Sequence, residues 1–413
     1  MANVSSSNGL EKRPKLRFPG FDEPWKAALL SDYFAKNIKK NADGAITNVI
    51  CNSAKQGLIP QRDYFDKDIA NSDNTDGYYI IETNDFVYNP RKSTDAPCGP
   101  ISSYKYPEAG IVSPLYLCFR AKQEINPLYF EWYFRSSAWH RYIYMSGDSG
   151  ARHDRVSIKD DTFFAMPINI PSAKEQDRIA LFLNAIEQKI DKQRSLVDAL
   201  KKYKRGVTRR LFAQEKGSFE TNLQIVSLGD LFPFIRNGFV GTVTPFFTDR
   251  EHGVRYLQGT NIHAGKITDD TVYYVTKDFN AKHSKNILKR DDILVVQSGH
   301  VGECAVVGKE YEGANCHALI IMSNGGNCFS DYVAQYINSE AGNKQIASIT
   351  TGNTIRHILA SAIADMVIPI PSLEEQKRVA YLLSIYDDRI AKEEQLLSEL
   401  EAMRKGLLQQ LFI

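Results

Sequence analysis

The feature that most constrains this chain is a segment that occurs twice, 200 residues apart. The stretch "IPSAKEQDRIALFL" begins at Ile170, and "IPSLEEQKRVAYLL" begins at Ile370. Aligned without gaps, residues 170–212 and 370–412 share fifteen identities. Because similarity at a fixed spacing is typical of repeated structural units, the chain is expected to contain one architecture twice.

Each copy has the pattern of a helix start. Proline ends the preceding segment, Ser172 or Ser372 is placed to cap free backbone N–H groups, and Glu175 or Glu375 follows three residues later. This spacing predicts a capping box, in which the acid reaches back to the cap residue. Apolar residues then recur every three or four positions, which predicts a paired helical seam in each copy. The predicted seam residues are Ile179, Leu183, Ile186, Ile190, Leu200, Val379, Leu383, Ile390, Leu397 and Leu400.

The charges of the two copies favour pairing within the chain. Residues 170–213 hold eleven Lys and Arg against five Asp and Glu, whereas residues 370–413 hold six against eight. Opposite flanking charges select partner and orientation in paired helices. If both copies have equivalent surroundings, the simplest arrangement is an antiparallel coiled coil with pseudo-twofold symmetry.

Weaker echoes precede each copy of the repeat. For example, "NDFVYNPR" (84–91) is matched by "RDDILVVQSG" (290–299), an acidic turn before an apolar strand in both cases. The predicted fold class is α+β, with two mixed domains that are each followed by a long helix. The predicted boundaries are 1–17 for a flexible tail, 18–169 for the first domain, 170–213 for the central helix, 214–369 for the second domain and 370–413 for the C-terminal helix.

Motifs of catalysis are missing from the sequence. It has no Walker A loop, no G-x-S-x-G and no H-E-x-x-H. Its six cysteines show no Cys-x-x-Cys spacing, which argues against a zinc site and a disulfide scaffold. No apolar run of about 18 residues occurs. We therefore expect a non-catalytic protein of the cytoplasm, with no catalytic residues, no metal site and no membrane partner.

Polar, glycine-punctuated loops in both halves are candidates for contact with DNA. Arg can bridge guanine, Asn and Gln can bridge adenine, and Lys neutralises phosphates. Four loops, "YNPRKST", "SGARHDR", "VQSGHVG" and "TTGNTIRH", and the basic stretch "KHSKNILKR" supply these side chains. The candidate residues are Tyr88, Asn89, Arg91, Lys92, Arg152, His153, Arg155, Lys282, Lys285, Gln297, Ser298, His300, Asn353 and Arg356.

Two variable domains, each followed by an "IPS..EQ" helix, resemble the specificity subunit of a type I restriction–modification system. "GLIPQRDYFDKDIA" (57–70) and "RYLQGTNIHAGKI" (255–267) also resemble segments of target-recognition domains in that family. The resemblance implies a subunit that reads a bipartite, asymmetric site in double-stranded DNA, with the helices setting the spacer. It also implies two modification (methyltransferase) subunits that use S-adenosylmethionine to methylate adenine, and restriction subunits that use ATP and Mg²⁺. No cofactor is then expected in this chain.

Two other function classes stay open at the level of sequence. One is a coiled-coil scaffold whose globular heads bind proteins, and the other is an enzyme, a solitary methyltransferase or nuclease. The net charges of residues 1–169 and 214–369 are near zero, at +1 and −3. Since affinity for DNA depends on phosphates neutralised, the isolated chain is expected to bind DNA weakly.

Overall fold

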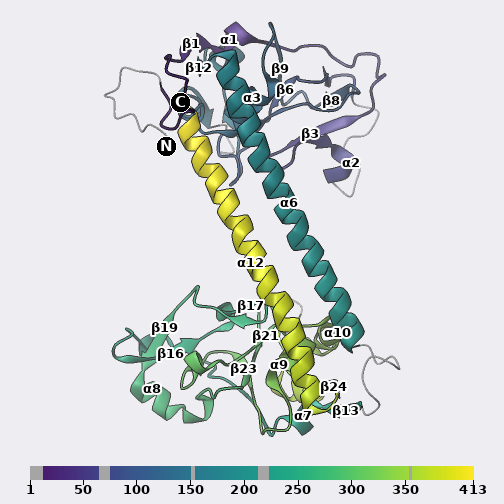
Figure 1. Cartoon of the computed structure of the whole chain (residues 1–413), viewed down its shortest axis with the longest axis vertical. Coiled ribbons are helices and arrows are strands. Elements are labelled where there is room, and N and C mark those ends of the chain that lie inside the picture. The colour runs from purple at the N-terminus through teal and green to yellow at the C-terminus, as the bar shows by residue number, and fades with distance from the viewer. Residues whose placement is uncertain (1–12, 65–74, 150–153, 213–222, 353–355) are drawn as a thin grey trace. The chain divides into compact units, whose positions relative to one another are not determined.

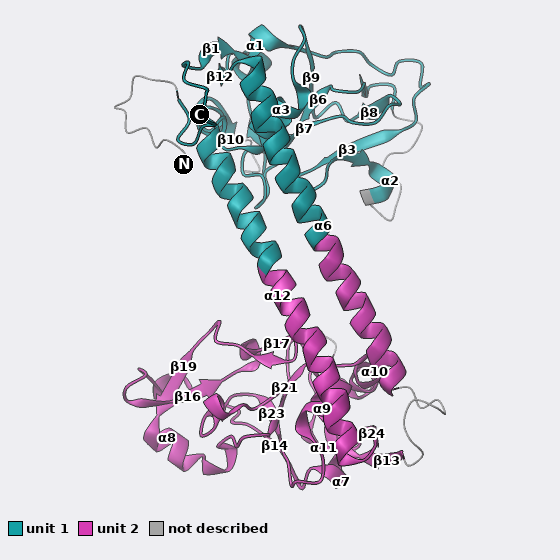
Figure 2. Cartoon of the chain, in the orientation of Figure 1, with its two compact units in different colours: residues 1–193, 396–413 teal, residues 194–395 magenta. Residues whose placement is uncertain are grey.

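The computed structural model describes residues 13–64, 75–149, 154–212, 223–352 and 356–413. The chain divides into two compact units (Figure 2). Unit 1 comprises residues 1–193 and 396–413, and unit 2 comprises residues 194–395. Each unit therefore contains one globular region and a segment of each long helix. The predicted domain boundaries stay a prediction.

The two copies of the repeat form the long helices α6 (Ala173–Phe212) and α12 (Leu373–Leu411) (Figure 1). The backbone N–H of Glu175 donates to Ser172 Oγ at 3.3 Å, and the Gln176 side chain donates to the Pro171 carbonyl at 3.0 Å. The same two bonds recur at α12, from Glu375 to Ser372 Oγ at 3.4 Å and from Gln376 to the Pro371 carbonyl at 2.9 Å. The repeated Pro-Ser-x-x-Glu-Gln sequence thus forms the same helix N-terminus in both copies.

The repeated acids are used differently from the predicted capping box. Glu175 is buried and accepts two hydrogen bonds from the guanidinium of Arg17, at 2.7 and 2.8 Å. Glu375 instead accepts from Arg378, one turn further along α12, at 3.0 Å. In unit 1 the acid therefore ties the segment before the first strand to the start of α6.

In unit 1 the first part of α6 packs against the last part of α12. Ile186, Ile190 and Leu400 form a buried apolar cluster, with Leu397 and Leu407 packed on it. Arg404 pairs with Glu187 at 2.5 Å. Nearer the start of α6 and the end of α12, Ile179 and Leu183 share the unit 1 core with Leu411 and Phe412. Residues later in α6 contact residues earlier in α12, so these two helix segments are antiparallel.

Unit 2 contains the corresponding contact between the other parts of the helices. Lys204 pairs with Asp387 at 2.5 Å, and Lys201 pairs with Glu394 at 2.6 Å. The rings of Tyr203 and Tyr386 lie 5.6 Å apart. The Glu187–Arg404 pair of unit 1 and the Asp387–Lys204 pair of unit 2 occupy equivalent positions of the repeat. Each unit therefore makes the same ion pair once. The predicted antiparallel pairing is confirmed within each unit.

The remaining predicted seam residues have varied environments. Val379 and Leu383 lie in the unit 2 core together with Phe212, which ends α6. Ile390 is buried, and Leu200 is half-buried. Part of the seam therefore packs on the globular regions as well as on the opposite helix.

The globular region of unit 1 contains two four-stranded sheets. One has the order β2-β9-β6-β7 and the other β4-β3-β8-β5. The strands of the sheets are β2 (Phe34–Lys36), β3 (Val49–Ser53), β4 (Gly57–Pro60), β5 (Tyr79–Ile81), β6 (Phe86–Tyr88), β7 (Ile101–Ser103), β8 (Gly110–Val112) and β9 (Leu117–Ala121). Two further pairs are β1 (Lys26–Leu29) with β12 (Pro167–Ile170), and β10 (Asp148–Ser149) with β11 (Val156–Ser157). The helices are α1 (Leu30–Tyr33), α2 (Gln61–Tyr64), α3 (Pro127–Arg135), α4 (His140–Ser146) and α5 (Asp160–Phe164).

Unit 2 repeats this construction. Its sheets have the orders β14-β23-β20-β21 and β15-β19-β16-β22. The strands are β14 (Phe234–Asn237), β15 (Phe247–Thr248), β16 (Gly253–Leu257), β19 (Tyr273–Thr276), β20 (Ile293–Val296), β21 (Cys304–Val306), β22 (Asn315–Cys316) and β23 (Leu319–Ser323). Two further pairs are β13 (Gln224–Ser227) with β24 (Val367–Ile370), and β17 (Ile262–His263) with β18 (Lys266–Ile267). The helices are α7 (Leu228–Leu231), α8 (Lys277–Lys282), α9 (Ser330–Ile337), α10 (Glu340–Ile349) and α11 (Ala360–Ala364), with 3₁₀ turns η2 (Thr244–Phe246), η3 (Gly259–Asn261), η4 (Ser284–Asn286) and η5 (Lys309–Tyr311).

Matching elements carry the weak echoes of the sequence. Strand order β2-β9-β6-β7 corresponds to β14-β23-β20-β21, and the parallel pair β3·β8 corresponds to β16·β22. The strand that precedes each long helix pairs with the first strand of its region, as β1·β12 and β13·β24. The predicted α+β fold with an internal repeat is confirmed.

Replacing Ile190 tests the seam. Its side chain is fully buried in the cluster with Leu400, so Ile190→Ala is expected to lower the free energy of unfolding by about 2–5 kcal/mol. Leu181 lies on the same helix with 64% of its side chain exposed, and Leu181→Ala is expected to change it by less than about 0.5 kcal/mol. Urea unfolding of the isolated variants measures both. Equal losses of unfolding free energy in Ile190→Ala and Leu181→Ala would contradict the assignment of Ile190 to the helix seam.

Candidate nucleic-acid interface

In unit 1 the loop that follows β6 pairs with the segment that leads into β11. Arg91 and Arg155 form an isolated antiparallel bridge. The Lys92 N–H donates to the Asp154 carbonyl at 2.8 Å, and the Val156 N–H donates to the Pro90 carbonyl at 2.9 Å. Two segments that are more than 60 residues apart in the sequence therefore form one surface, which contains Arg91, Lys92 and Arg155.

Unit 2 contains the same arrangement. The loop that follows β20 pairs with the segment before α11, because Ser298 bridges His357 and the Ile358 N–H donates to the Gln297 carbonyl at 3.1 Å. The bridge brings Gln297 and Ser298 next to the segment that begins at Arg356. We call the two pairs the paired loops: residues 89–92 with 154–156 in unit 1, and 297–300 with 356–358 in unit 2.

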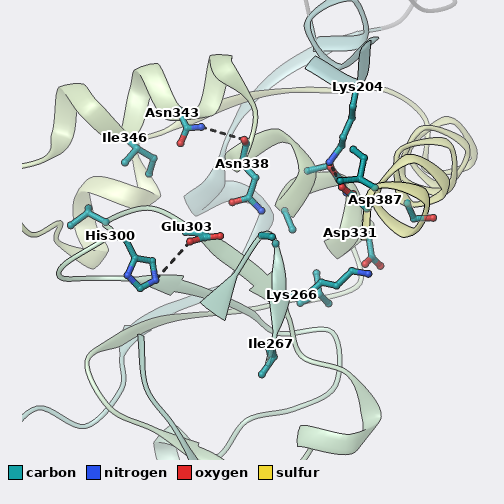
Figure 3. Close-up of a pocket in the computed structure, with 18 of the residues that line it drawn as sticks. Lys204, Lys266, Ile267, His300, Glu303, Asp331, Asn338, Asn343, Ile346 and Asp387 are labelled. Atoms are coloured by element: carbon teal, nitrogen blue, oxygen red, sulfur yellow. Dashed lines mark hydrogen bonds and ion pairs between the residues drawn. The ribbon is translucent and has the colours of Figure 1, made fainter. Parts of the chain in front are cut away.

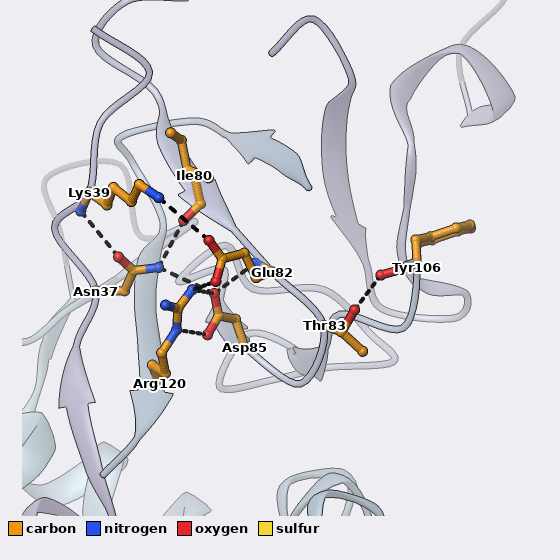
Figure 4. A network of polar contacts seen from close by, with 8 residues as sticks. All are labelled: Asn37, Lys39, Ile80, Glu82, Thr83, Asp85, Tyr106 and Arg120. Carbon is orange, nitrogen blue, oxygen red and sulfur yellow. Dashed lines mark hydrogen bonds and ion pairs between the residues drawn. The ribbon is translucent and has the colours of Figure 1, made fainter. Parts of the chain in front are cut away.

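A network of polar contacts holds the start of β6 (Figure 4). Asp85 is buried and accepts from Arg120 at 2.6 and 2.7 Å, and from the backbone N–H of Glu82 at 2.8 Å. Asn37 donates to the Ile80 carbonyl at 2.8 Å and to Asp85 at 3.3 Å. Because β6 leads directly into the paired loops, this network fixes the base of the unit 1 surface.

Asp292 has the corresponding place at the start of β20. It is buried and accepts from the backbone N–H of Lys289 at 3.0 Å. Burial raises the pKa of the Asp292 carboxyl, against the opposing effects of that hydrogen bond and of Arg236. The residues before these acids, Asn84 and Asp291, both have positive φ, of 71° and 65°. The acidic pair at 291–292 thus forms a turn into a strand.

Two of the candidate residues belong to the scaffold. Tyr88 is 1% exposed, and its hydroxyl donates to the Cys98 carbonyl at 2.8 Å. Burial raises the pKa of that hydroxyl. The prediction that Tyr88 contacts DNA is therefore wrong, since its side chain lies in the core. Asn89 is half-buried and holds the loop itself, by accepting from the Arg91 N–H at 3.1 Å and donating to the Asn52 carbonyl at 3.2 Å.

The other candidates in the described parts of the chain lie at the surface. Arg91, Ser298 and Arg356 are exposed, whereas Lys92, Arg155 and Gln297 are half-buried. Gln297 donates to the side chain of Asn237 at 3.4 Å. His300 approaches the Ile262 carbonyl with Nε2 at 3.1 Å.

The remaining candidates are not part of the paired loops as described. Lys282 ends α8, and Lys285 lies in η4; both are exposed. The Lys285 carbonyl accepts from Arg236, which is adjacent in sequence to the Asn237 that Gln297 contacts. Arg152, His153 and Asn353 lie outside the described residues.

Comparison with known proteins finds similarity to one family. Residues 220–402 match the family model described as "Type I restriction modification DNA specificity domain". The predicted resemblance to type I specificity subunits is confirmed.

Similar proteins of other organisms are named as type I specificity subunits. The MjaVIII specificity subunit of Methanocaldococcus jannaschii is 24% identical over 266 residues, which cover 60% of this chain and 61% of that protein. The EcoKI subunit of Escherichia coli is 28% identical over 180 residues, which cover 38% of this chain and 37% of that protein. The StySPI subunit of Salmonella potsdam is 30% identical over 181 residues, with the same coverage.

Solved structures share the fold over almost the whole chain. A crystal structure of the S subunit from M. genitalium aligns with a TM-score of 0.59, at 14% identity, over 97% of this chain and 99% of that one. A chain from a structure that describes assembly and conformational transition of a type I R–M system aligns with the same TM-score, at 16% identity, over 95% and 98%.

A large cavity lies next to the paired loops of unit 2 (Figure 3). Its volume is about 1240 Å³, and it is lined by both long helices, the β17–β18 hairpin and the loop that contains His300. Asp387 on α12 accepts from Lys204 and, at 2.7 Å, from Gln335. Sequence reasoning missed this cavity because separate segments of the chain build its wall.

Two residues of the cavity wall, His300 and Glu303, lie beside His263, which is not part of the wall. His263, His300 and Glu303 each place a ligand atom within 4.8 Å of the others. From the sequence no metal site was expected, because only the spacing of the cysteines was considered.

Among the helices that the structure describes, none has the length and apolar character that a membrane crossing requires.

Removing the Asp85 carboxylate tests the support of the unit 1 loops. Asp85→Ala leaves the Glu82 N–H without its acceptor and leaves Arg120 with Glu82 as its remaining carboxylate partner, and is expected to lower the free energy of unfolding by about 2–3 kcal/mol. Asp95, whose pair with Lys55 spans 3.6 Å between exposed side chains, provides the control. Asp95→Ala is expected to cost less than about 1 kcal/mol. Chemical unfolding with hydrogen exchange at residues 86–92 measures both, and unchanged protection in Asp85→Ala would contradict the assignment.

Proposed function

We propose that this chain is the DNA-recognition subunit of a type I restriction–modification complex. The globular region of each unit reads one half of a bipartite, asymmetric site in double-stranded DNA. The long helices set the unread spacer between the halves and dock two modification subunits.

The observation that carries the proposal is the repetition of the paired loops with different side chains. Residues 90–92 are Pro-Arg-Lys, and the corresponding residues 297–299 are Gln-Ser-Gly. Arg bridges guanine by two hydrogen bonds, whereas Gln bridges adenine. One scaffold with two sets of donors and acceptors suits a protein that reads two unlike half-sites.

The docking role is supported by apolar side chains that both helices expose at matched positions. Repeat positions 181 and 381 carry Leu and Tyr, and are 64% and 70% exposed. The same holds for three further pairs, all of them exposed: Phe182 with Leu382, Leu196 with Leu396, and Tyr203 with Met403. We call these four pairs the repeated apolar face. Because exposed apolar patches mark interaction sites, two copies of one face suit two copies of one partner.

The chemistry of the complex is assigned to the partners. In this proposal the modification subunits bind S-adenosylmethionine and methylate adenine, and the restriction subunits use ATP and Mg²⁺ to translocate and cleave DNA. This chain contributes recognition without catalysis, in the cytoplasm. The partners also supply much of the phosphate contact, because both globular regions are close to neutral.

A protein-binding scaffold is the second candidate function. The repeated apolar face alone would fit it equally well. The exposed guanidinium groups of Arg91 and Arg356 in the paired loops favour DNA, since Arg is the side chain best suited to both guanine and phosphate. Protection of a bipartite DNA site by the assembled complex separates the two.

Exchanging one globular region tests the division of labour. A chain in which residues 18–169 come from another type I specificity subunit is expected to change one half-site and to keep the other half-site and the spacer length. Mapping methylated adenines in DNA modified by the assembled complex reads out both halves. If both half-sites change together, the two regions do not read independently.

Single substitutions in the repeated apolar face test the docking of two partners. Leu181→Asp or Tyr381→Asp alone is expected to reduce the stoichiometry from two modification subunits to one, because an exposed apolar contact becomes a buried unpaired charge. The double variant is expected to bind none. Ile38→Asp, at a 69% exposed apolar residue off the helices, is the control and keeps two. Native mass spectrometry counts the subunits, and two in the double variant would contradict the proposal.

A further inference from the structure

We propose that His263, His300 and Glu303 of unit 2 form a binding site for one zinc ion. The three residues come from the β17–β18 hairpin and from the loop that joins β20 to β21. The proposal rests on their geometry alone, and does not depend on the proposed function in DNA recognition.

The distances suit one shared metal ion. Glu303 Oε2 lies 3.7 Å from His300 Nε2, too far for a hydrogen bond between them. Two ligands of a tetrahedral zinc ion, each bound at about 2.0–2.1 Å, are about 3.3 Å apart. The rings of His263 and His300 stack with their centroids 5.4 Å apart and their planes at 16°. One ligand atom of each residue lies within 4.8 Å of those of the other two. His300 Nε2 also lies 3.1 Å from the Ile262 carbonyl, so a zinc ion bound there would take the place of that contact.

The backbone holds both ligand-bearing segments in place. In the hairpin, Ala264 and Gly265 have positive φ, which closes the two-residue turn that follows His263. In the loop, the Gly302 N–H donates to the Val296 carbonyl at 2.9 Å, and the Val296 N–H donates to the Glu303 carbonyl at 2.8 Å. A Cβ on Gly302 would lie 2.3 Å from Ile346, so this glycine lets the loop pack closely on α10. Little ordering is then needed when a metal binds.

The ligand set selects the type of metal. Two imidazoles with one carboxylate suit zinc, whereas magnesium and calcium prefer sets of oxygen ligands. Three protein ligands leave a coordination position open. Because His300 and Glu303 line the large cavity together with Lys266 and Arg356, a water molecule or an anionic group can take that position. Zinc would also link the hairpin to the loop that contains Gln297 and Ser298.

Unit 1 does not repeat this site at the matching loop. Where unit 2 has His300, the corresponding position of the loop after β6 holds Ser93, as the bridges at Arg91 and Ser298 set the alignment. One zinc ion per chain, held by unit 2, is therefore expected.

Competition between the full chain and a chromogenic zinc chelator, after removal of metal, tests the proposal. The unsubstituted protein is expected to bind one zinc ion. His263→Ala and Glu303→Gln are each expected to weaken binding by at least about tenfold, since each removes one of three ligands. His252→Ala is the control, because His252 is exposed and pairs with Asp249 elsewhere in unit 2. It is expected to leave zinc affinity unchanged.

Thermal unfolding distinguishes a loss of zinc affinity from a loss of folded stability in the variants. Without metal, the variants are expected to unfold at the temperature of the unsubstituted chain, since His263 and His300 are exposed and Glu303 is only half-buried. Added zinc is expected to raise the midpoint of the unsubstituted protein and of His252→Ala, and added magnesium to leave both unchanged. Absence of zinc binding, or binding that survives in the double variant His263→Ala/Glu303→Gln, would overturn the proposal.

Discussion

Burial of the repeated helix seam is the interaction on which the rest of the structure depends. Each globular region contains small sheets of short strands, and each completes its core with side chains of the long helices. Ile179 and Leu183 enter the core of unit 1 together with Phe412, while Val379 and Leu383 enter that of unit 2 together with Phe212. The start of one helix and the end of the other are thus parts of each folded unit. Neither region is expected to fold as a free domain without its helix segments.

This dependence explains why the repeat keeps its register over 200 residues. The ion pair between Glu187 and Arg404 in unit 1 is equivalent, by the repeat, to the pair between Asp387 and Lys204 in unit 2. A slip of one residue would separate these partners and would rotate the apolar residues away from the opposite helix. The same register sets the positions of the repeated apolar face, so internal packing and the proposed docking surface are constrained together.

Most of the fold features that the sequence predicted correctly depend on patterns within short stretches of the chain. The helix starts at Ser172 and Ser372, the antiparallel pairing and the acidic turn at 291–292 follow from spacing, charge and turn chemistry within short stretches. Tyr88 shows where this reasoning ends. Tyr88 is the last residue of β6, in which all three residues are buried, whereas Arg91 in the loop that follows is exposed. The error therefore lies in where the strand ends and the loop begins. The role of Glu175 was missed for another reason, because its partner Arg17 is 158 residues away.

The paired loops lie between these two cases. The four loops were selected for their composition, yet the bridges from Arg91 to Arg155 and from Ser298 to His357 depend on the sheets that bring them together. The cavity of unit 2 depends on segments that are even further apart in the sequence, from Lys201 to Glu394. The group of His263, His300 and Glu303 depends on the contact between the β17–β18 hairpin and the loop after β20.

A structure of the assembled complex bound to its methylation site would test the central claim most directly. The account predicts that the paired loops of unit 1 contact bases of one half-site, that those of unit 2 contact bases of the other, and that the long helices contact no bases between them. Base contacts from only one unit, or DNA bound on a surface that excludes Arg91 and Gln297, would contradict it.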